Sequence, residues 1–271
     1  MFDVSSDRPA RQPALFLPHG GGPCFFMDDP RDIWTNMGAF LRAVPDMLPA
    51  RPRAILIASG HWETKGFAFT GADEPSLIYD YYNFPAHTYA LRYDVPGAPE
   101  LAARAADLLA GAGLAAHVDP ARGLDHGVFV PLKVAFPDAA IPVVEMSVER
   151  TLDPARAIEA GRALSPLRDE GVLIIGSGMS FHNMRGYGDP RSTAPSVAFD
   201  RWLTDAVRQP GPDRARSLAA WEEAPAARFA HPKAEHLLPL MVAAGAGDDA
   251  PGEKIYGEQV LETAISGFRF G

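Results

Sequence analysis

The segment AILIASGHWE spans residues 54–63 and joins an apolar run directly to a histidine. Residues 54–58 are continuously apolar, which is typical of a strand covered on both faces of a sheet. Ser59 and Gly60 end the run, and glycine lets the backbone turn sharply or approach another group closely. We therefore expect His61 at the carboxyl edge of a sheet, where ligands bind in open α/β folds.

Two other segments repeat this order. The run ALFL at 14–17 is followed by PHGGGP, which contains His19, and the run VLII at 172–175 is followed by GSGMSFHN, which contains His182. A fourth histidine, His126, lies in GLDHG at 123–127 and is also expected at a strand end. The glycines at 20–22 and 178 would let the chain bend at the same edge. The sequence therefore predicts several imidazoles gathered at one edge of the sheet.

The rest of the chain alternates between strand-like and helix-like patterns. Further strands are expected at 67–70, 141–148 and 268–270. Apolar residues at helical spacing predict helices at 31–44, 100–110, 154–168, 199–207 and 234–244. This alternation favours an α/β fold with a central mixed or parallel sheet flanked by helices. We expect a single domain over 1–271, with residues 1–12 as a loose N-terminal arm.

Composition narrows the classes of function. The chain has 271 residues, a net charge of −9 and a single cysteine, Cys24. Without a basic block, nucleic acid is not an expected partner, and one cysteine excludes both an internal disulfide framework and a thiolate-rich zinc site. No apolar run approaches the ~20 residues needed to span a bilayer. We expect a cytoplasmic protein without a membrane partner, and a homo-oligomer is compatible with the sequence.

The segment FAHPKAEHLLPL at 229–240 is the other histidine-rich region. Pro232 suits the first turn of a helix, so we expect His231 just before that helix and His236 within it. His236 could complete a metal site, but Glu235 is an alternative, because two histidines and one carboxylate form a common iron site.

Polar neighbours of the histidines are candidates for fixing the second ring nitrogen, as metal-binding histidines require. These are Asp125, Glu63 and Asn183, each close in sequence to a histidine. Arg185 and Arg191 are candidates for binding a carboxylated substrate. The aromatic residues Tyr79, Tyr81, Tyr82, Phe84 and Tyr89 either pack together or wall an aromatic pocket.

Other candidate sites are weaker. Cys24 is interpreted as a small packing residue, and His87 and His117 as surface or structural residues. Ser177 and Ser180 lie near His182 in sequence, but no G-x-S-x-G elbow surrounds either serine. The glycines at 20–22 are not followed by Lys-Ser or Lys-Thr, so the segment is not a phosphate-binding P-loop.

Taken in order, five segments resemble the class III extradiol ring-cleavage dioxygenases. They are PHGGGP, SGHWE, LDHG-x-F-x-PL, SGMSFHN and HPKAEHLLPL, and they extend from about residue 14 to 240. The similarity is to the DOPA 4,5-dioxygenase-like branch, related to the catalytic subunit of protocatechuate 4,5-dioxygenase. It implies an α/β domain with one mononuclear metal site that uses dioxygen to open a catechol-type ring.

The resemblance also implies roles for individual residues. It makes His19 and His61 metal ligands and His236 the histidine that completes the site. His182 corresponds to either a further ligand or the catalytic acid/base, and His126 to an active-site histidine outside the ligand set. Fe(II) is the expected ion, with Zn(II) as the alternative, and the expected reactants are a small aromatic diol and O2.

Two other classes of function remain to be weighed against this one. A zinc-dependent hydrolase could use the same histidines, with a metal-bound hydroxide as nucleophile. A non-catalytic metal- or ligand-binding protein could share the fold, since fold does not determine function.

Overall fold

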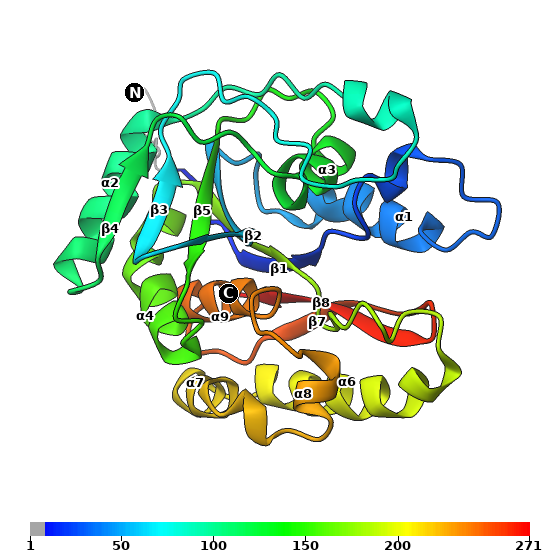
Figure 1. The fold of residues 1–271 in the computed structure, drawn as a ribbon. Coiled ribbons are helices and arrows are strands. Elements are labelled where there is room, and N and C mark those ends of the chain that lie inside the picture. Colours follow the sequence, from blue (N-terminus) through cyan, green and yellow to red (C-terminus); the bar gives the residue numbers. More distant parts are fainter. Residues whose placement is uncertain (1–8) are drawn as a thin grey trace, which may run out of the picture.

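The computed structural model describes residues 9–271. Within this range, eight strands form one mixed sheet in the order β4-β3-β5-β2-β6-β1-β8-β7 (Figure 1). The strands are β1 Ala14–Pro18, β2 Ala54–Thr64, β3 Phe67–Thr70, β4 Ala116–Asp119, β5 Val143–Glu149, β6 Val172–Gly178, β7 Glu253–Val260 and β8 Thr263–Phe270. Strands β1, β6, β2 and β5 are parallel neighbours, whereas β8 pairs antiparallel with both β1 and β7. The predicted α/β class with a mixed sheet is confirmed.

Helices cover both faces of the sheet. They are α1 Thr35–Ala43, α2 Pro99–Gly111, α3 His126–Ala135, α4 Pro154–Leu164, α5 Pro166–Asp169, α6 Thr193–Val207, α7 Gly211–Ala219, α8 Ala227–Ala230 and α9 Leu238–Ala246. In Figure 1, α1 and α3 lie on one side of β1, and α9 with α4 lies on the other. No helix in the described part of the chain is both long and apolar enough to span a bilayer.

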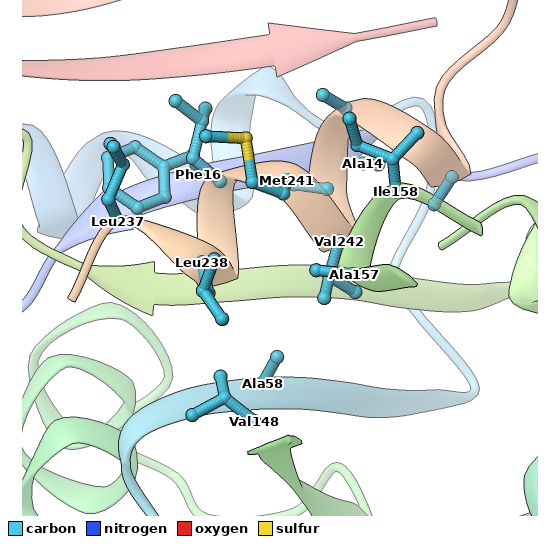
Figure 2. Close-up of a cluster of buried hydrophobic side chains, with 14 of the residues drawn as sticks. Ala14, Phe16, Ala58, Val148, Ala157, Ile158, Leu237, Leu238, Met241 and Val242 are labelled. Carbon is cyan, nitrogen blue, oxygen red and sulfur yellow. The ribbon is translucent and has the colours of Figure 1, made fainter. Parts of the chain in front are cut away.

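The central strands are apolar on both faces because each face has its own core. Alternate residues of a strand point to opposite faces, so β1 sends Phe16 into one core and Leu15 into the other. Strand β2 divides in the same way, with Leu56 in the first core and Ile57 in the second. Figure 2 shows the first core, where Phe16 lies among residues of α9 and α4. The unbroken apolar runs of the sequence are explained by this double burial.

Several predicted boundaries were wrong in ways that matter for the site. Strand β2 continues through Gly60 to Thr64, so His61 lies within the strand, next to a register shift between Ser59 and Glu63. The helix expected at 234–244 begins only at Leu238, so His236 precedes it and Pro232 opens no helix. His126 does not lie at the end of a strand; it is the first residue of α3 and comes seven positions after β4 ends at Asp119.

The expected N-terminal arm, residues 1–12, falls mostly on residues 1–8, which lie outside the described residues. At its inner end, Gln12 is buried and its backbone N–H donates to the carbonyl of Arg168 at 3.1 Å. Arg11 forms ion pairs with Asp169 and Asp248 on the surface. The chain is therefore attached to the domain by residues 11 and 12.

Candidate metal centre and active site

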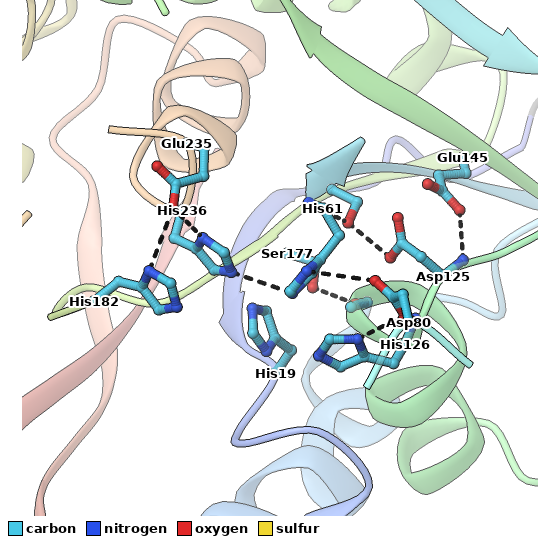
Figure 3. Close-up of polar contacts among 12 residues, drawn as sticks. His19, His61, Asp80, Asp125, His126, Glu145, Ser177, His182, Glu235 and His236 are labelled. Atoms are coloured by element: carbon cyan, nitrogen blue, oxygen red, sulfur yellow. Dashed lines mark hydrogen bonds and ion pairs between the residues drawn. The ribbon is translucent and has the colours of Figure 1, made fainter. Parts of the chain in front are cut away.

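Three of the predicted histidines converge at the edge of the sheet. His19 follows β1, His61 lies in β2, and His236 precedes α9; one ligand atom from each lies within 4.8 Å of the others. The Nε2 atoms of His61 and His236 are 3.1 Å apart. The centroid of the His19 ring lies 5.0 Å from that of the His61 ring and 5.2 Å from that of the His236 ring. Figure 3 shows the three rings facing one another.

Each of these rings has its Nδ1 close to an oxygen. His19 Nδ1 is 2.9 Å from the carbonyl of Gly20, and His236 Nδ1 is 3.1 Å from Glu235 Oε1. His61 Nδ1 lies 3.5 Å from Asp80 Oδ2. Because an Nδ1–H donating to oxygen leaves the lone pair on Nε2, this arrangement presents Nε2 for coordination.

A divalent cation fits this centre. Among the described residues, His19 Nε2 is a buried polar atom without a hydrogen-bond partner, which is costly unless something binds it. Burial, followed by the neighbouring imidazoles, holds the pKa of His19 well below its usual range. Burial likewise lowers the pKa of His61 to about 4. The rings are therefore neutral near pH 7, as metal binding requires.

Asp80 and His126 form a second polar group beside the centre. His126 Nδ1 lies 2.7 Å from Asp80 Oδ1, which also accepts the backbone N–H of His126 at 2.9 Å. Burial alone would raise the pKa of Asp80, but the hydrogen bonds from His126 outweigh it and bring the pKa to about 2. Asp80 therefore carries a negative charge that both His61 and His126 face. Sequence reasoning missed this residue, although it lies within the aromatic cluster at 79–84.

His182 and Glu235 form a third group. The ring of His182 stacks on that of His236, with centroids 3.5 Å apart and planes at 12°. Glu235 Oε1 lies 3.4 Å from His182 Nδ1 and 3.1 Å from His236 Nδ1. Burial would raise the pKa of Glu235, but hydrogen bonds from both histidines outweigh it, so its pKa is well below the usual range. The carboxylate thus faces the outer nitrogens of two histidines.

The polar neighbours suggested by the sequence have other partners. Asp125 Oδ1 accepts the hydroxyl of Ser59 at 2.8 Å, and its other oxygen pairs with Arg122. Glu63 forms an ion pair with Lys233, and the amide of Asn183 donates to the carbonyl of Phe229. The oxygens that face the histidine rings come instead from Gly20, Asp80 and Glu235.

Glycines let the histidine-bearing segments approach one another. An added Cβ at Gly178 would lie 2.2 Å from the carbonyl oxygen of His236, and one at Gly60 would lie 2.8 Å from that of Glu235. These two glycines allow close packing of the 235–236 segment. Gly20 and Gly22 have positive φ values of 80° and 56° and form the turn after His19, which is the bend expected at this edge.

The site opens into a cavity of about 750 Å³, lined by His19, His61, His126 and His182. Of the predicted aromatic cluster, Tyr81, Tyr82 and Phe84 line this cavity. Tyr79 and Tyr89 pack against Tyr81 behind them. The cluster is therefore both packing and pocket wall. Neither Arg185 nor Arg191 lines the cavity, whereas Arg31 does.

The weaker candidates lie outside this chemistry. Cys24 is buried, and burial raises the pKa of its thiol to about 12, as suits a packing residue. The Ser177 hydroxyl donates to the carbonyl of Gly127. Ser180 Oγ accepts the backbone N–H of Ser266 at 2.7 Å. Neither serine hydroxyl forms a hydrogen bond with His182.

His231 is a buried core residue that makes acid destabilisation testable. Its Nε2 donates to the carbonyl of Ser180 at 3.0 Å, and burial lowers its pKa to about 4. In the unfolded chain, His231 binds a proton near its ordinary pKa of 6.5, whereas the folded protein keeps the ring neutral down to about pH 4. The stability that the neutral ring contributes is therefore fully present above pH 6.5 and is lost as the pH falls toward 4. In metal-free protein, we expect His231→Gln to reduce this loss by up to about 1.4 kcal/mol per pH unit. The free energy of unfolding, measured with urea at pH 7.5, 6 and 5, tests this prediction.

The matched control is His117→Gln, at an exposed position on β4. It should keep the pH dependence of the parent protein. An unchanged dependence in His231→Gln would show that His231 is not held neutral by the fold.

Comparisons with known proteins agree with the geometry. A family model described as the catalytic LigB subunit of aromatic ring-opening dioxygenase matches residues 13–268. The chain is 40% identical to the 4,5-DOPA dioxygenase extradiol of Beta vulgaris, over 89% of this chain and 90% of that protein. It is 38% identical to the dioxygenase tasH of Hapsidospora irregularis, over 98% of this chain and 88% of that protein.

A solved structure is also similar. The uncharacterized protein JW3007 of Escherichia coli K12 matches with a TM-score of 0.78 and 28% sequence identity, covering 96% of this chain and all of that one. The family resemblance read from the five sequence segments is confirmed. The chain belongs to the family of the catalytic LigB subunit of aromatic ring-opening dioxygenases and is an extradiol ring-cleaving dioxygenase.

Proposed function

We propose that the enzyme opens a catechol-type ring at a mononuclear Fe(II) centre held by His19, His61 and His236. The observation that carries this proposal is the convergence of one nitrogen from each of these rings within 4.8 Å. A bound ferrous ion supplies Lewis-acid activation of the diol and the redox chemistry through which dioxygen reacts. Zn(II) suits the same imidazole ligands and is the alternative ion.

His236, and not Glu235, is the third ligand in this proposal. Glu235 faces the Nδ1 atoms of His236 and His182, which is the arrangement of a carboxylate that orients ligating or reacting imidazoles. The group that contains His19 and His61 includes His236 and no carboxylate. This grouping supports a three-histidine centre.

His182 is assigned the role of acid/base. Its ring lines the cavity. The possible ligand atoms that lie within 4.8 Å of it belong to Glu235 and His236, in a group that contains neither His19 nor His61. With Nδ1 directed to Glu235, Nε2 is the atom available to accept a hydroxyl proton from the diol. We therefore place His182 among the catalytic residues and outside the ligand set.

His126 is assigned the role of holding the substrate. Its ring lines the cavity. The centroid of this ring lies 4.0 Å from that of the His61 ring and 5.7 Å from that of the His19 ring. Because Nδ1 faces Asp80 at 2.7 Å, the other nitrogen is available for a hydrogen bond to a diol oxygen. His126 is therefore the second proposed catalytic residue, with Asp80 as the group that positions it.

Asp80→Asn tests this positioning role. The amide loses the negative charge and offers one acceptor oxygen where the carboxylate offers two, so it cannot hold the Nδ1 atoms of both His61 and His126. We expect kcat to fall roughly 10–100-fold, the range typical for partners of metal-site histidines. Asp94→Asn, at an exposed position paired with Arg92, is the control and should retain full turnover. Full turnover in Asp80→Asn would remove Asp80 from the mechanism.

The reaction itself is tested with metal-free protein reconstituted without oxygen. After addition of Fe(II), a catechol and then air, we expect oxygen uptake with a yellow ring-opened semialdehyde. Zinc-loaded protein that hydrolyses esters independently of oxygen would favour the hydrolase alternative. A cytoplasmic location and homo-oligomeric assembly stay predictions of the sequence.

A further inference from the structure

The cavity at the metal centre extends far beyond the histidines. Its volume of about 750 Å³ lies within the roughly 300–1,000 Å³ range of pockets that hold drug-sized ligands. A bare catechol bound at the histidines would leave most of this space to water. Besides the histidines, the lining includes five large apolar side chains, Trp34, Tyr82, Phe84, Met184 and Leu261, together with the charged residues Asp28, Asp29 and Arg31.

Two of these side chains are seated directly on the turn that follows His19. A Cβ at Gly21 would lie 3.3 Å from the Trp34 ring, and a Cβ at Gly22 would lie 2.9 Å from the Phe84 ring. The backbone N–H of Trp34 also donates to Asp29 Oδ2 at 2.7 Å. The aromatic wall is therefore fixed to the same turn that carries a proposed metal ligand.

Tyr82 and Met184 line the rim and are unusually exposed. Their exposed fractions are 80% and 72%, the largest among the exposed large hydrophobic residues in the described chain. They come from segments far apart in sequence, after β3 and after β6, yet both line this cavity. Apolar surface gathered around a pocket marks a ligand-binding site, because a ligand that covers it removes that surface from water.

We propose that these five residues, Trp34, Tyr82, Phe84, Met184 and Leu261, form an outer subsite that binds an apolar or aromatic substituent of the catechol. The proposal rests on the proposed function, since the histidines must hold the diol end. A substituent that extends from the ring reaches the aromatic wall and covers Tyr82 and Met184. The preferred substrate class is thus catechols with a bulky apolar substituent, over unsubstituted or small carboxylated catechols.

The test compares three probes on the iron-loaded enzyme: catechol, 4-phenylcatechol and 3,4-dihydroxybenzoate. For each, kcat/KM is measured by oxygen uptake, and Kd by equilibrium dialysis without oxygen. We expect 4-phenylcatechol to exceed catechol by at least about tenfold in both quantities, corresponding to about 1.4 kcal/mol. In Tyr82→Ala and Met184→Ala, this ratio should fall by about threefold or more.

Val197→Ala is the matched control, because Val197 is an exposed apolar residue of α6 that does not line the cavity. This variant should have the same kcat/KM and the same Kd as the parent enzyme for all three probes. A preference for 3,4-dihydroxybenzoate, or a phenyl preference that neither Tyr82→Ala nor Met184→Ala alters, would overturn the subsite. Tighter binding of 4-phenylcatechol without ring cleavage would support the subsite and contradict the proposed function, so the two failures are distinguishable.

Discussion

His19→Ala is expected to lose most metal binding and, with it, most turnover. Removing this imidazole deletes one of the three nitrogens that converge within 4.8 Å. If the roughly 10–16 kcal/mol typical of structural zinc sites is divided over four ligands, one ligand contributes about 2.5–4 kcal/mol. That corresponds to a loss of roughly 10²–10³-fold in metal affinity. When iron is supplied at a concentration below that needed to fill the site, turnover should fall by at least the same factor.

Metal analysis after anaerobic reconstitution with Fe(II) measures this prediction, followed by an oxygen-uptake assay. His117→Ala, which removes an exposed histidine on β4, is the control and should retain both metal and activity. Because His19 is buried, circular dichroism is needed to show that the variant is folded. Normal iron content in folded His19→Ala would place the ion elsewhere.

His182→Ala is expected to retain metal and lose most turnover. A positioned base typically contributes 10²–10⁴-fold in rate, so kcat should fall by a factor in that range. Iron content should stay close to that of the parent enzyme, because the group containing His19 and His61 does not include His182. Some affinity loss is expected, since the His182 ring packs on His236.

The split between metal content and kcat separates the two possible roles of His182. His182→Gln, which keeps a polar side chain but cannot act as a base near neutral pH, should retain metal and be as slow as His182→Ala. If His182→Ala lost iron as completely as His19→Ala, His182 would be a ligand and the proposed acid/base role would be wrong.

Sequence reasoning located much of the histidine cluster because several of its members lie at or just after conspicuous strand patterns. Buried parallel strands are continuously apolar, and the residues just after them face one edge of the sheet. This located His19 and His182 near their observed positions. His61 was placed in a loop, but β2 continues past it with a shifted register. That shift depends on pairing with β5, which lies more than 80 residues away.

The segment before α9 shows a second limit. Its composition suggested a helix, but Met179 N–H donates to the carbonyl of His236 at 3.1 Å. That carbonyl is therefore engaged by the end of β6, and the helix starts only at Leu238, with Pro239 in its first turn. Close approach across Gly60 and Gly178 allows this contact, and no local pattern predicts it.

The elements missed from the sequence also depend on long-range contacts. Helix α3 is buried along nearly its whole length and contains Pro131, so it lacks an amphipathic pattern. Strand β7 is at the edge of the sheet and is half-buried or exposed along nearly its whole length, with charged residues among its apolar ones. Asp80 was missed because it faces His61 and His126 from a segment without a strand or helix pattern.

The most direct test is an anomalous-diffraction experiment on crystals of the Fe(II)-reconstituted enzyme grown without oxygen. Within residues 9–271, three groups of side chains could hold an ion: His19 with His61 and His236, His61 with Asp80 and His126, and His182 with Glu235 and His236. We predict a single anomalous peak at the iron edge, within bonding distance of His19, His61 and His236. A peak in either of the other two groups, with His19 unbound, would contradict the account.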